Sequence, residues 1–237
     1  MIKFFRKIRY DLMSLGKTSK YLKYALGEII LVVIGILIAL QINNWNIANK
    51  DKKKEAVYLS KIESNLEDDI ALYKSIMSQD STMLDQLNIL MRSLTDESET
   101  EILKIRRNIP FLMTTQSFTP NKTTFDNMIS SGQVEIITND SLVEQLFLYY
   151  REVNLLNNGI DKALLDYSRN TFGPFILSYG DINHRNEDID HYKNHPFLVN
   201  GTFFKLNMVS GQIRAYDQQI KRAQNLIDMV KNELGDD

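Results

Sequence analysis

The 237-residue chain contains no cysteine. Disulfide bonds, thiolate metal sites, catalytic thiols and lipid attachment at a cysteine are therefore excluded. The chain has only four prolines and ten glycines, and neither residue type occurs between Gly35 and Pro110. Because proline and glycine are the strongest helix breakers, so long a gap between them is typical of continuous helix.

Sequence motifs for catalysis are also missing. The chain has no phosphate-binding glycine loop, nucleophile elbow or paired-histidine zinc helix. Ser130 and Ser131 precede Gly132 without a neighbouring histidine, so they are better explained as a helix end than as nucleophiles. Adjacent acids such as Asp68 and Asp69 are expected on a solvated face. We therefore predict that the protein is not an enzyme and has no cofactor.

The net charge of −2 conceals two regions of opposite sign. Residues 1–23 contain seven bases and one acid, whereas the remainder contains 21 bases and 29 acids. An acidic body without a basic stripe is a poor match for nucleic acid, so we expect no nucleic-acid partner. The basic end, in which Ile2, Phe5, Ile8 and Leu12 share one helical face, is suited to a membrane surface.

A long apolar stretch follows the basic end. Ile29 to Leu40 is unbroken apolar sequence, and within 24–42 only Glu28 and Gln41 are strongly polar. Nineteen helical residues rise about 28 Å, which matches the hydrocarbon core of a bilayer. A buried core helix is the alternative. Tyr21, Tyr24 and Trp45 at the two ends favour the membrane, because such rings suit its interfaces.

The charges around this stretch predict its orientation. The excess of bases before it places the N-terminus in the cytoplasm and the rest of the chain outside. Leu40 is followed by Gln-Ile-Asn-Asn-Trp rather than by a small-x-small cleavage site, which indicates an uncleaved signal anchor. We therefore expect a basic cytoplasmic segment at 1–23, a transmembrane anchor at 24–45 and an external domain at 46–237.

Two stretches of this N-terminal region resemble a known family. MIKFFRKIR and GEIILVVIGILIALQINNWN are similar to the start of an uncharacterised family of Bacteroidetes membrane proteins. The resemblance covers residues 1–46 and continues more weakly through 123–150. It implies a location in a Gram-negative inner membrane, with the external domain in the periplasm, and it implies no activity.

Two features inside the predicted span concern partners. Gly27, Gly35 and Ala39 share one helical face, and Gly35-x-x-x-Ala39 is a small-residue pair that permits close approach of a second helix. Glu28 lies about one turn inside the cytoplasmic edge, where it can reach headgroup water. The alternative for Glu28 is an intramembrane carboxylate that pairs with a partner subunit or carries protons.

Apolar residues at helical spacing predict three long helices outside the span. One runs from about 59 to 94, interrupted at Asp69 and Asp80, and with no breaker at 43–58 it can extend the membrane helix. A second covers 142–167, capped by Asn139 or Asp140. A third begins near Pro196 and has an apolar series at Leu206, Val209, Ile213, Tyr216, Ile220, Ala223, Ile227, Val230 and Leu234.

Shorter helices are predicted at 99–115, kinked at Pro110, and at 122–131, ended by Gly132. The run Val134 to Ile137 is compatible with one short strand that has no partner. The predicted fold is all-α: an N-terminal transmembrane helix followed by an antiparallel bundle of long helices of coiled-coil type. The C-terminal helix returns along the first.

The polar loop at 179–195 contains all three histidines, His184, His191 and His195. His191 and His195 are four residues apart, so on a helical turn both could bind one metal ion with a carboxylate. A solvated loop with unligated histidines is the favoured interpretation, because the spacing matches no recognised metal motif. These histidines are therefore weak metal candidates.

The leading functional hypothesis is a single-pass inner-membrane protein whose periplasmic helical domain acts as a scaffold or accessory subunit. It would bind the lipid bilayer and either a protein partner or further copies of itself, through the transmembrane and long helices. The alternatives are a periplasmic ligand-binding or sensing domain, and a proton-coupled membrane-complex subunit that uses Glu28.

Overall fold

The computed structural model describes residue 10 and residues 18–98, 100–179 and 188–235. It divides the chain into two compact units, Met1–Glu55 and Ala56–Asp237. Among the described residues the secondary structure consists of helices without strands, which confirms the predicted all-α class.

The first unit contains the start of helix α2, whose bounds are Thr18–Thr95. The helix is long and apolar enough to cross a membrane, and none of the residues in its most apolar 18-residue window is buried. Ile29 is 61% exposed, Leu31 65% and Leu37 58%. A helix that presents apolar side chains on every face is suited to a lipid environment rather than to water.

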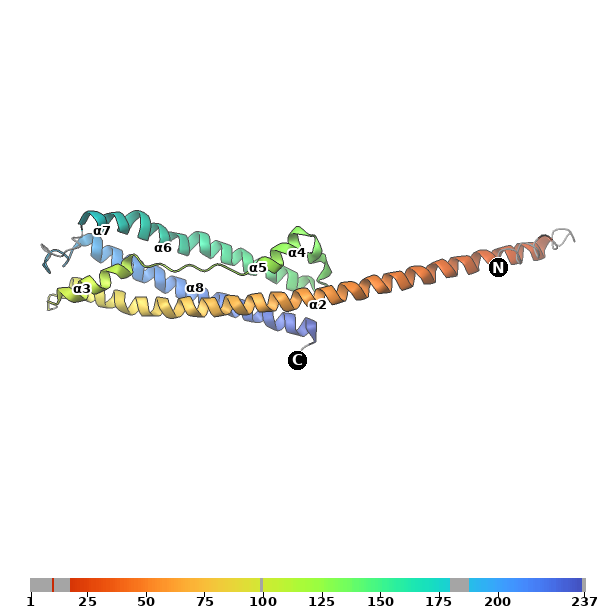
Figure 1. The fold of residues 1–237 in the computed structure, drawn as a ribbon, viewed down its shortest axis with the longest axis horizontal. Coiled ribbons are helices and arrows are strands. Elements are labelled where there is room, and N and C mark those ends of the chain that lie inside the picture. Colours follow the sequence, from red (N-terminus) through yellow and green to blue (C-terminus); the bar gives the residue numbers. More distant parts are fainter. Residues whose placement is uncertain (1–9, 11–17, 99, 180–187, 236–237) are drawn as a thin grey trace. The chain divides into compact units, whose positions relative to one another are not determined.

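The second unit is built from three helical rods, which Figure 1 shows lying side by side. The first rod is the part of α2 after Glu55. The second runs through α5–α7 and the third is α8, Pro196–Leu234. The remaining elements are α3 (Ile102–Asn108), η1 (Ile109–Leu112), α4 (Thr123–Ser130), η2 (Gln133–Ile136), α5 (Asp140–Leu156), η3 (Asn157–Asp161), α6 (Lys162–Asp166), η4 (Tyr167–Phe172) and α7 (Gly173–Tyr179).

The third rod is antiparallel to the first. Lys231 Nζ lies 3.5 Å from Glu63 Oε1 near one end, and the Asn194 amide donates to the Leu94 carbonyl at 2.9 Å near the other. The second rod runs parallel to the first, because the extended segment 113–122 first carries the chain back along the bundle (Figure 1). The C-terminal helix therefore returns along α2, as predicted. The sequence did not indicate that the second rod runs parallel to the first.

Most helix boundaries follow local rules that the sequence exposes. The Asn139 side chain accepts a hydrogen bond from the Leu142 amide at 3.1 Å and caps α5. Pro196 is the first residue of α8, and Gly132 has a left-handed φ of 69° just after α4. The possible strand at Val134 is wrong: η2 is a 3-10 helix, since no neighbouring strand is present among the described residues to pair with it.

The buried face of α2 repeats every seven residues, as in a coiled coil. Its buried members include the interrupting acids Asp69 and Asp80, so the acids lie within the seam and not beside it. Within the second unit the full set is Leu59, Ile62, Leu66, Asp69, Ile70, Tyr73, Ile76, Asp80, Met83, Leu87, Leu90, Ser93 and Leu94.

The buried face of α8 differs from the predicted apolar series. Leu206, Ile213 and Ile220 are only partly buried, and the central positions beside them belong to Lys205, Gln212 and Gln219. Other members of the predicted series are buried as expected: Val209, Tyr216, Ala223, Ile227 and Val230. Apolar spacing therefore found the buried face but missed the polar residues at its centre. A polar residue takes a core position when buried partners satisfy its hydrogen-bonding groups, which a sequence pattern does not reveal.

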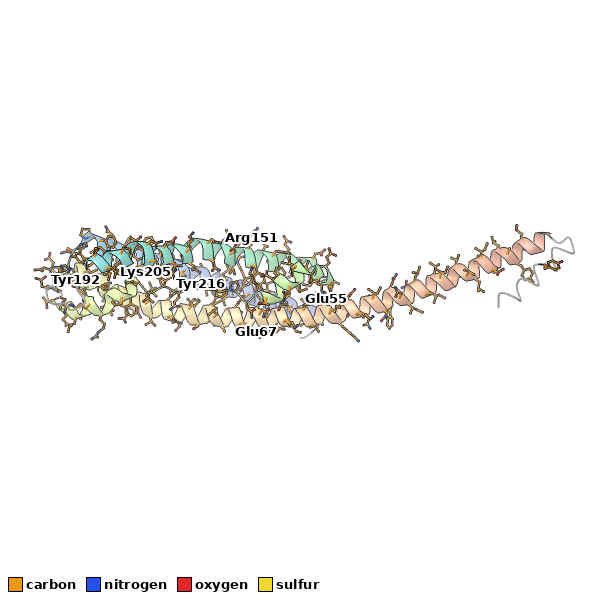
Figure 2. The ribbon with its side chains drawn as sticks, turned by 45° about the horizontal axis from the view of Figure 1, so that its top comes forward. Glu55, Glu67, Arg151, Tyr192, Lys205 and Tyr216 are labelled. Carbon is orange, nitrogen blue, oxygen red and sulfur yellow. The ribbon has the colours of Figure 1, made fainter. Side chains whose placement is uncertain are left out.

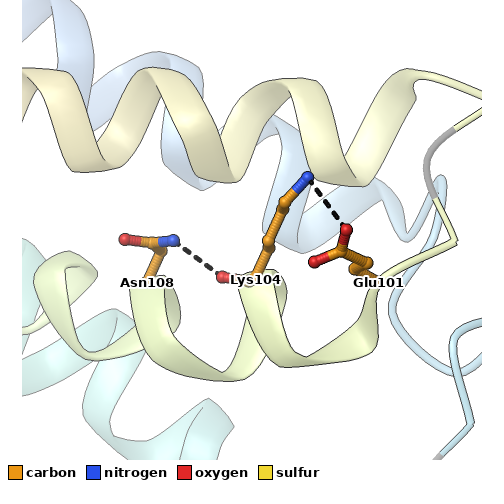
Figure 3. A network of polar contacts seen from close by, with 3 residues as sticks. All are labelled: Glu101, Lys104 and Asn108. Carbon is orange, nitrogen blue, oxygen red and sulfur yellow. Dashed lines mark hydrogen bonds and ion pairs between the residues drawn. The ribbon is translucent and has the colours of Figure 1, made fainter.

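Helix α3 is short and is held by local polar contacts (Figure 3). Lys104 Nζ lies 3.6 Å from Glu101 Oε1, and Asn108 Nδ2 donates to the Lys104 carbonyl at 2.7 Å. Both members of the ion pair are exposed, so the pair adds little stability. Ile105 and Leu112, both 0% exposed, bind the α3–η1 turn to the core.

One close contact between rods provides a test of the packing. A Cβ added at Gly201 on α8 would collide with the Tyr167 hydroxyl, which is buried and has no hydrogen-bond partner within the described chain. We expect Gly201→Ala to lower the free energy of unfolding by about 1–3 kcal/mol, as overpacking does. The measurement is urea denaturation of the full chain in detergent micelles, followed by circular dichroism.

The control is a double variant. Tyr167→Phe removes the colliding oxygen and loses no hydrogen bond in return. Gly201→Ala combined with Tyr167→Phe should therefore regain the stability of the unmodified chain, helped by about 1 kcal/mol from alanine in a helix. Equal losses with and without Tyr167→Phe would show that the contact does not limit the packing.

Candidate functional site

The core of the second unit consists of two hydrophobic clusters. One contains Leu66, Tyr73 and Tyr149, and the other contains Leu87, Phe172 and Val209. Polar side chains lie at the level between the two clusters, and we call this set the polar layer. Its members are Asp80 on α2, Thr115 in the extended segment, Asp161 at the end of η3, Ser168 in η4, and Lys205, Gln212 and Tyr216 on α8.

Lys205 is the basic member of the polar layer and is 0% exposed. Its ammonium donates to Thr115 Oγ1 at 2.9 Å and to Ser168 Oγ at 3.3 Å. The two hydroxyl oxygens are 2.9 Å apart. Burial lowers the pKa of Lys205 to about 8, and Asp80 opposes this by attraction. At neutral pH the side chain is still mainly a cation.

Asp80 is the least satisfied member of the layer. It is 0% exposed, and neither carboxylate oxygen has a hydrogen-bond partner in the part of the chain that the structure describes. Burial raises the pKa of Asp80 to about 6; Lys205 lowers it and Asp161 raises it further. Asp80 therefore changes its charge close to neutral pH.

Asp161 is well satisfied. It accepts from Gln212 Nε2 at 2.6 Å and from the Tyr216 hydroxyl at 2.8 Å. With its amide nitrogen turned toward the carboxylate, Asn157 also donates to Asp161 Oδ2 at 3.1 Å. Burial still raises the pKa of Asp161, and these hydrogen bonds oppose the rise. Figure 2 labels Lys205 and Tyr216 along the same helix.

A third buried acid, Asp69, lies on α2 about three turns before Asp80. Its Oδ2 accepts from the Tyr149 hydroxyl at 2.8 Å and its Oδ1 from the Asn121 amide at 2.7 Å. Asp69 is 1% exposed, and burial raises its pKa. The expectation that Asp68 and Asp69 form a solvated pair is therefore wrong for Asp69, because its position belongs to the α2 seam. The sequence signal for this burial was that Asp69 interrupts the apolar seam of α2.

Two π-helical segments place residues of the second rod in the polar layer. η3 ends at Asp161 and η4 contains Ser168. A π-helix accommodates one extra residue per turn and rotates the helix surface that follows. Asp161 and Ser168 are consequently buried, whereas Leu156, Ile160 and Tyr167 of the predicted seam are only partly buried. The apolar period predicted one regular helix and missed both π segments.

The two described histidines pack among aromatic rings. His191 stacks on Tyr179 with centroids 4.2 Å apart, and the Tyr179 hydroxyl donates to the His191 carbonyl. The His195 ring lies 5.5 Å from that of Phe175. No three histidine or acidic side chains are grouped for a metal ion within the described residues. The third candidate ligand, His184, lies outside them, so the metal interpretation stays a weak prediction.

The residues predicted to act inside the membrane all lie on α2. Gly27, Gly35 and Ala39 are exposed, and a Cβ at either glycine would meet no atom within 4 Å. Glu28 is half-buried. These positions leave room for a second helix against the small residues, and the membrane roles of all four residues stay predictions.

Access to the polar layer is restricted. Asp80, Asp161 and Lys205 are at most 3% exposed. Thr115 and Ser168, in contrast, also line a cavity of about 470 Å³. The charged groups of the polar layer are therefore closed off from solvent, and Thr115 and Ser168 belong both to the layer and to the cavity lining.

Most of the chain matches one known family. Residues 28–176 match DUF6090, a family of unknown function. The chain belongs to the DUF6090 family. No curated protein and no solved structure matches the chain. Membership confirms that the family is uncharacterised, as the N-terminal resemblance implied; the bacterial origin stays a prediction.

The raised pKa of Asp80 makes the stability of this DUF6090 member depend on pH. A pKa of about 6 in the folded chain, against 3.8 in the unfolded chain, stabilises the fold below pH 3.8. That contribution is lost as the pH rises through about 6. Between pH 4 and 6.5 the unmodified chain should therefore lose about 2 kcal/mol more of its unfolding free energy than Asp80→Asn does.

Urea denaturation of the full chain in micelles, repeated across this pH range, gives the comparison. Asp85 is exposed on the same helix, so Asp85→Asn should follow the unmodified chain. Parallel pH profiles for the unmodified chain and Asp80→Asn would contradict a raised pKa at Asp80.

Proposed function

We propose that this DUF6090 protein is a single-pass inner-membrane protein whose helical domain binds other proteins as a scaffold or accessory subunit. Residues 1–23 would lie at the cytoplasmic surface, 24–45 would span the bilayer and 46–237 would lie in the periplasm. The basic charge of the first segment and the exposed apolar helix support this topology.

The observation that carries a non-catalytic role is the burial of the ionisable groups in the interior of the domain. The groups whose pKa values are shifted toward acid–base chemistry, Asp69, Asp80, Asp161 and Lys205, are each at most 3% exposed. A substrate must come within hydrogen-bond distance of such a group, and packed side chains prevent this. Large apolar side chains are exposed instead, among them Leu103 at 65%, Leu155 at 63% and Phe203 at 62%.

These exposed side chains favour binding to other proteins, because apolar and aromatic residues contribute most of the energy of protein interfaces. The anchor at 24–45 offers a second surface for protein binding. Gly35 and Ala39 expose backbone on one face of α2, where a neighbouring helix can approach closely without a side-chain collision. A membrane partner could therefore contact both the anchor and the domain.

The topology is testable because the chain has no native cysteine, so one introduced thiol can be labelled without background. We expect exposed Ser98→Cys to react with a membrane-impermeant maleimide in spheroplasts of a Gram-negative host. Ser14→Cys should react only after the membrane is permeabilised, because the basic segment stays inside. The reverse labelling pattern would exclude a periplasmic domain.

Partner binding is tested on the full chain in the membranes of its source organism. Amine-reactive crosslinking followed by mass spectrometry should trap a stoichiometric membrane partner or a second copy of the chain. Introduced Gly35→Cys should also form disulfide-linked dimers if the partner is a second copy, because close helix approach brings identical positions together.

Leu37→Cys, which lies on a different face of the same helix, is the matched control and should crosslink much less. The proposal would be abandoned if the full chain is strictly monomeric in detergent and native membranes yield no crosslinked species.

A further inference from the structure

The cavity above the polar layer has the size of a small-molecule site. Its volume of about 470 Å³ falls within the roughly 300–1,000 Å³ usual for ligand pockets. Three elements of the second unit form it: the extended segment, the α6–η4 region and α7. The lining residues are Met113, Thr115, Leu165, Ser168, Arg169, Gly173, Pro174 and Leu177.

One side of the cavity is polar. Ser168, which is only 4% exposed, and Thr115 both belong to the cavity lining, and their hydroxyls accept from the buried Lys205 ammonium. One of the two hydroxyls donates to the other at 2.9 Å. The remaining proton has only distant backbone acceptors, with Leu112 O at 3.4 Å from Ser168 Oγ and Leu164 O at 3.5 Å from Thr115 Oγ1, so it can turn toward a stronger acceptor in the cavity.

The cation in the cavity lining is Arg169, which lies on the exposed surface of η4. Behind the lining, the Lys205 ammonium donates to the two hydroxyl groups, and the attraction of Asp80 partly offsets its charge. A negative ligand group beside Arg169 would therefore be favourable.

The other side of the cavity is apolar. Leu177 is 88% exposed and Met113 is 46% exposed, and Leu165 and Pro174 lie with them in the lining. Leu177 has the highest exposure among the large apolar residues described in this domain. Apolar side chains that remain exposed around a concave surface are typical of a binding site.

We propose that this cavity binds a small organic monocarboxylate with an apolar body. The carboxylate would accept hydrogen bonds from Arg169 and from one of the Thr115 and Ser168 hydroxyls, and the apolar body would cover Met113 and Leu177. The buried Lys205 polarises the two hydroxyls without touching the ligand. This role goes beyond protein binding and is independent of it.

The test uses the full chain in lipid nanodiscs and 4-(trifluoromethyl)benzoate as the probe, observed by ¹⁹F NMR. Empty nanodiscs give the background of lipid partitioning. We expect protein-dependent broadening of the probe signal that excess unlabelled benzoate reverses. The neutral analogue 4-(trifluoromethyl)benzyl alcohol should bind at least about tenfold more weakly, because it lacks the charge that Arg169 favours.

Two surface variants test the two sides separately without disturbing the core. Arg169→Gln should weaken benzoate binding about tenfold and leave the weak binding of the alcohol unchanged. Leu177→Ser should weaken both probes, since it removes apolar contact area. Arg151→Gln, an exposed arginine on α5 outside the cavity lining, is the matched control and should change neither.

Three results would overturn the proposal: no protein-dependent broadening at millimolar probe, equal binding of acid and alcohol, or equal binding by Arg169→Gln and the unmodified chain. None of them affects the crosslinking test of protein binding. A failed crosslinking experiment likewise leaves the benzoate measurement intact, so the two proposals are separated by their readouts.

Discussion

The structure of the second unit depends on how the extended segment 113–122 is accommodated beside three helical rods. An extended strand without a sheet has backbone groups that no regular structure satisfies, and burying them unpaired would cost several kcal/mol. Here side chains of the rods supply partners. Asp69 accepts from the Asn121 backbone amide, Gln212 donates to the Gln116 carbonyl, and Asn157, with its amide nitrogen turned toward the segment, donates to the Phe118 carbonyl.

This requirement explains why acids and amides occupy positions that a coiled coil normally gives to apolar residues. Each polar residue fits one arrangement of the segment and the rods, so a shift of one helix turn would leave buried groups unpaired. The polar layer therefore fixes the register of the bundle. It also places the Lys205 ammonium against the hydroxyls of Thr115 and Ser168, two residues of the cavity lining.

Sequence patterns predicted the parts of the fold that depend on local rules. The absence of glycine and proline between Gly35 and Pro110 indicated that α2 is long. Asn139 was recognised as a cap of α5, and Pro196 marked the start of α8. The patterns failed where a residue's position depends on distant partners. Lys205 and Gln212 are not part of the predicted apolar series, yet both are buried, and Asp161 gave no sign of the π-helical turn that buries it.

The sequence by itself determined the all-helical class, the long apolar helix and the absence of cysteine chemistry, because each follows from residue types and their spacing along the chain. Only the tertiary structure decided that Asp80, Asp161 and Lys205 share one buried layer, and that Thr115 and Ser168 connect it to a cavity. These groups are separated by up to 125 positions in the chain. Their proximity arises from packing and from mutual hydrogen bonding, neither of which has a local periodic signature.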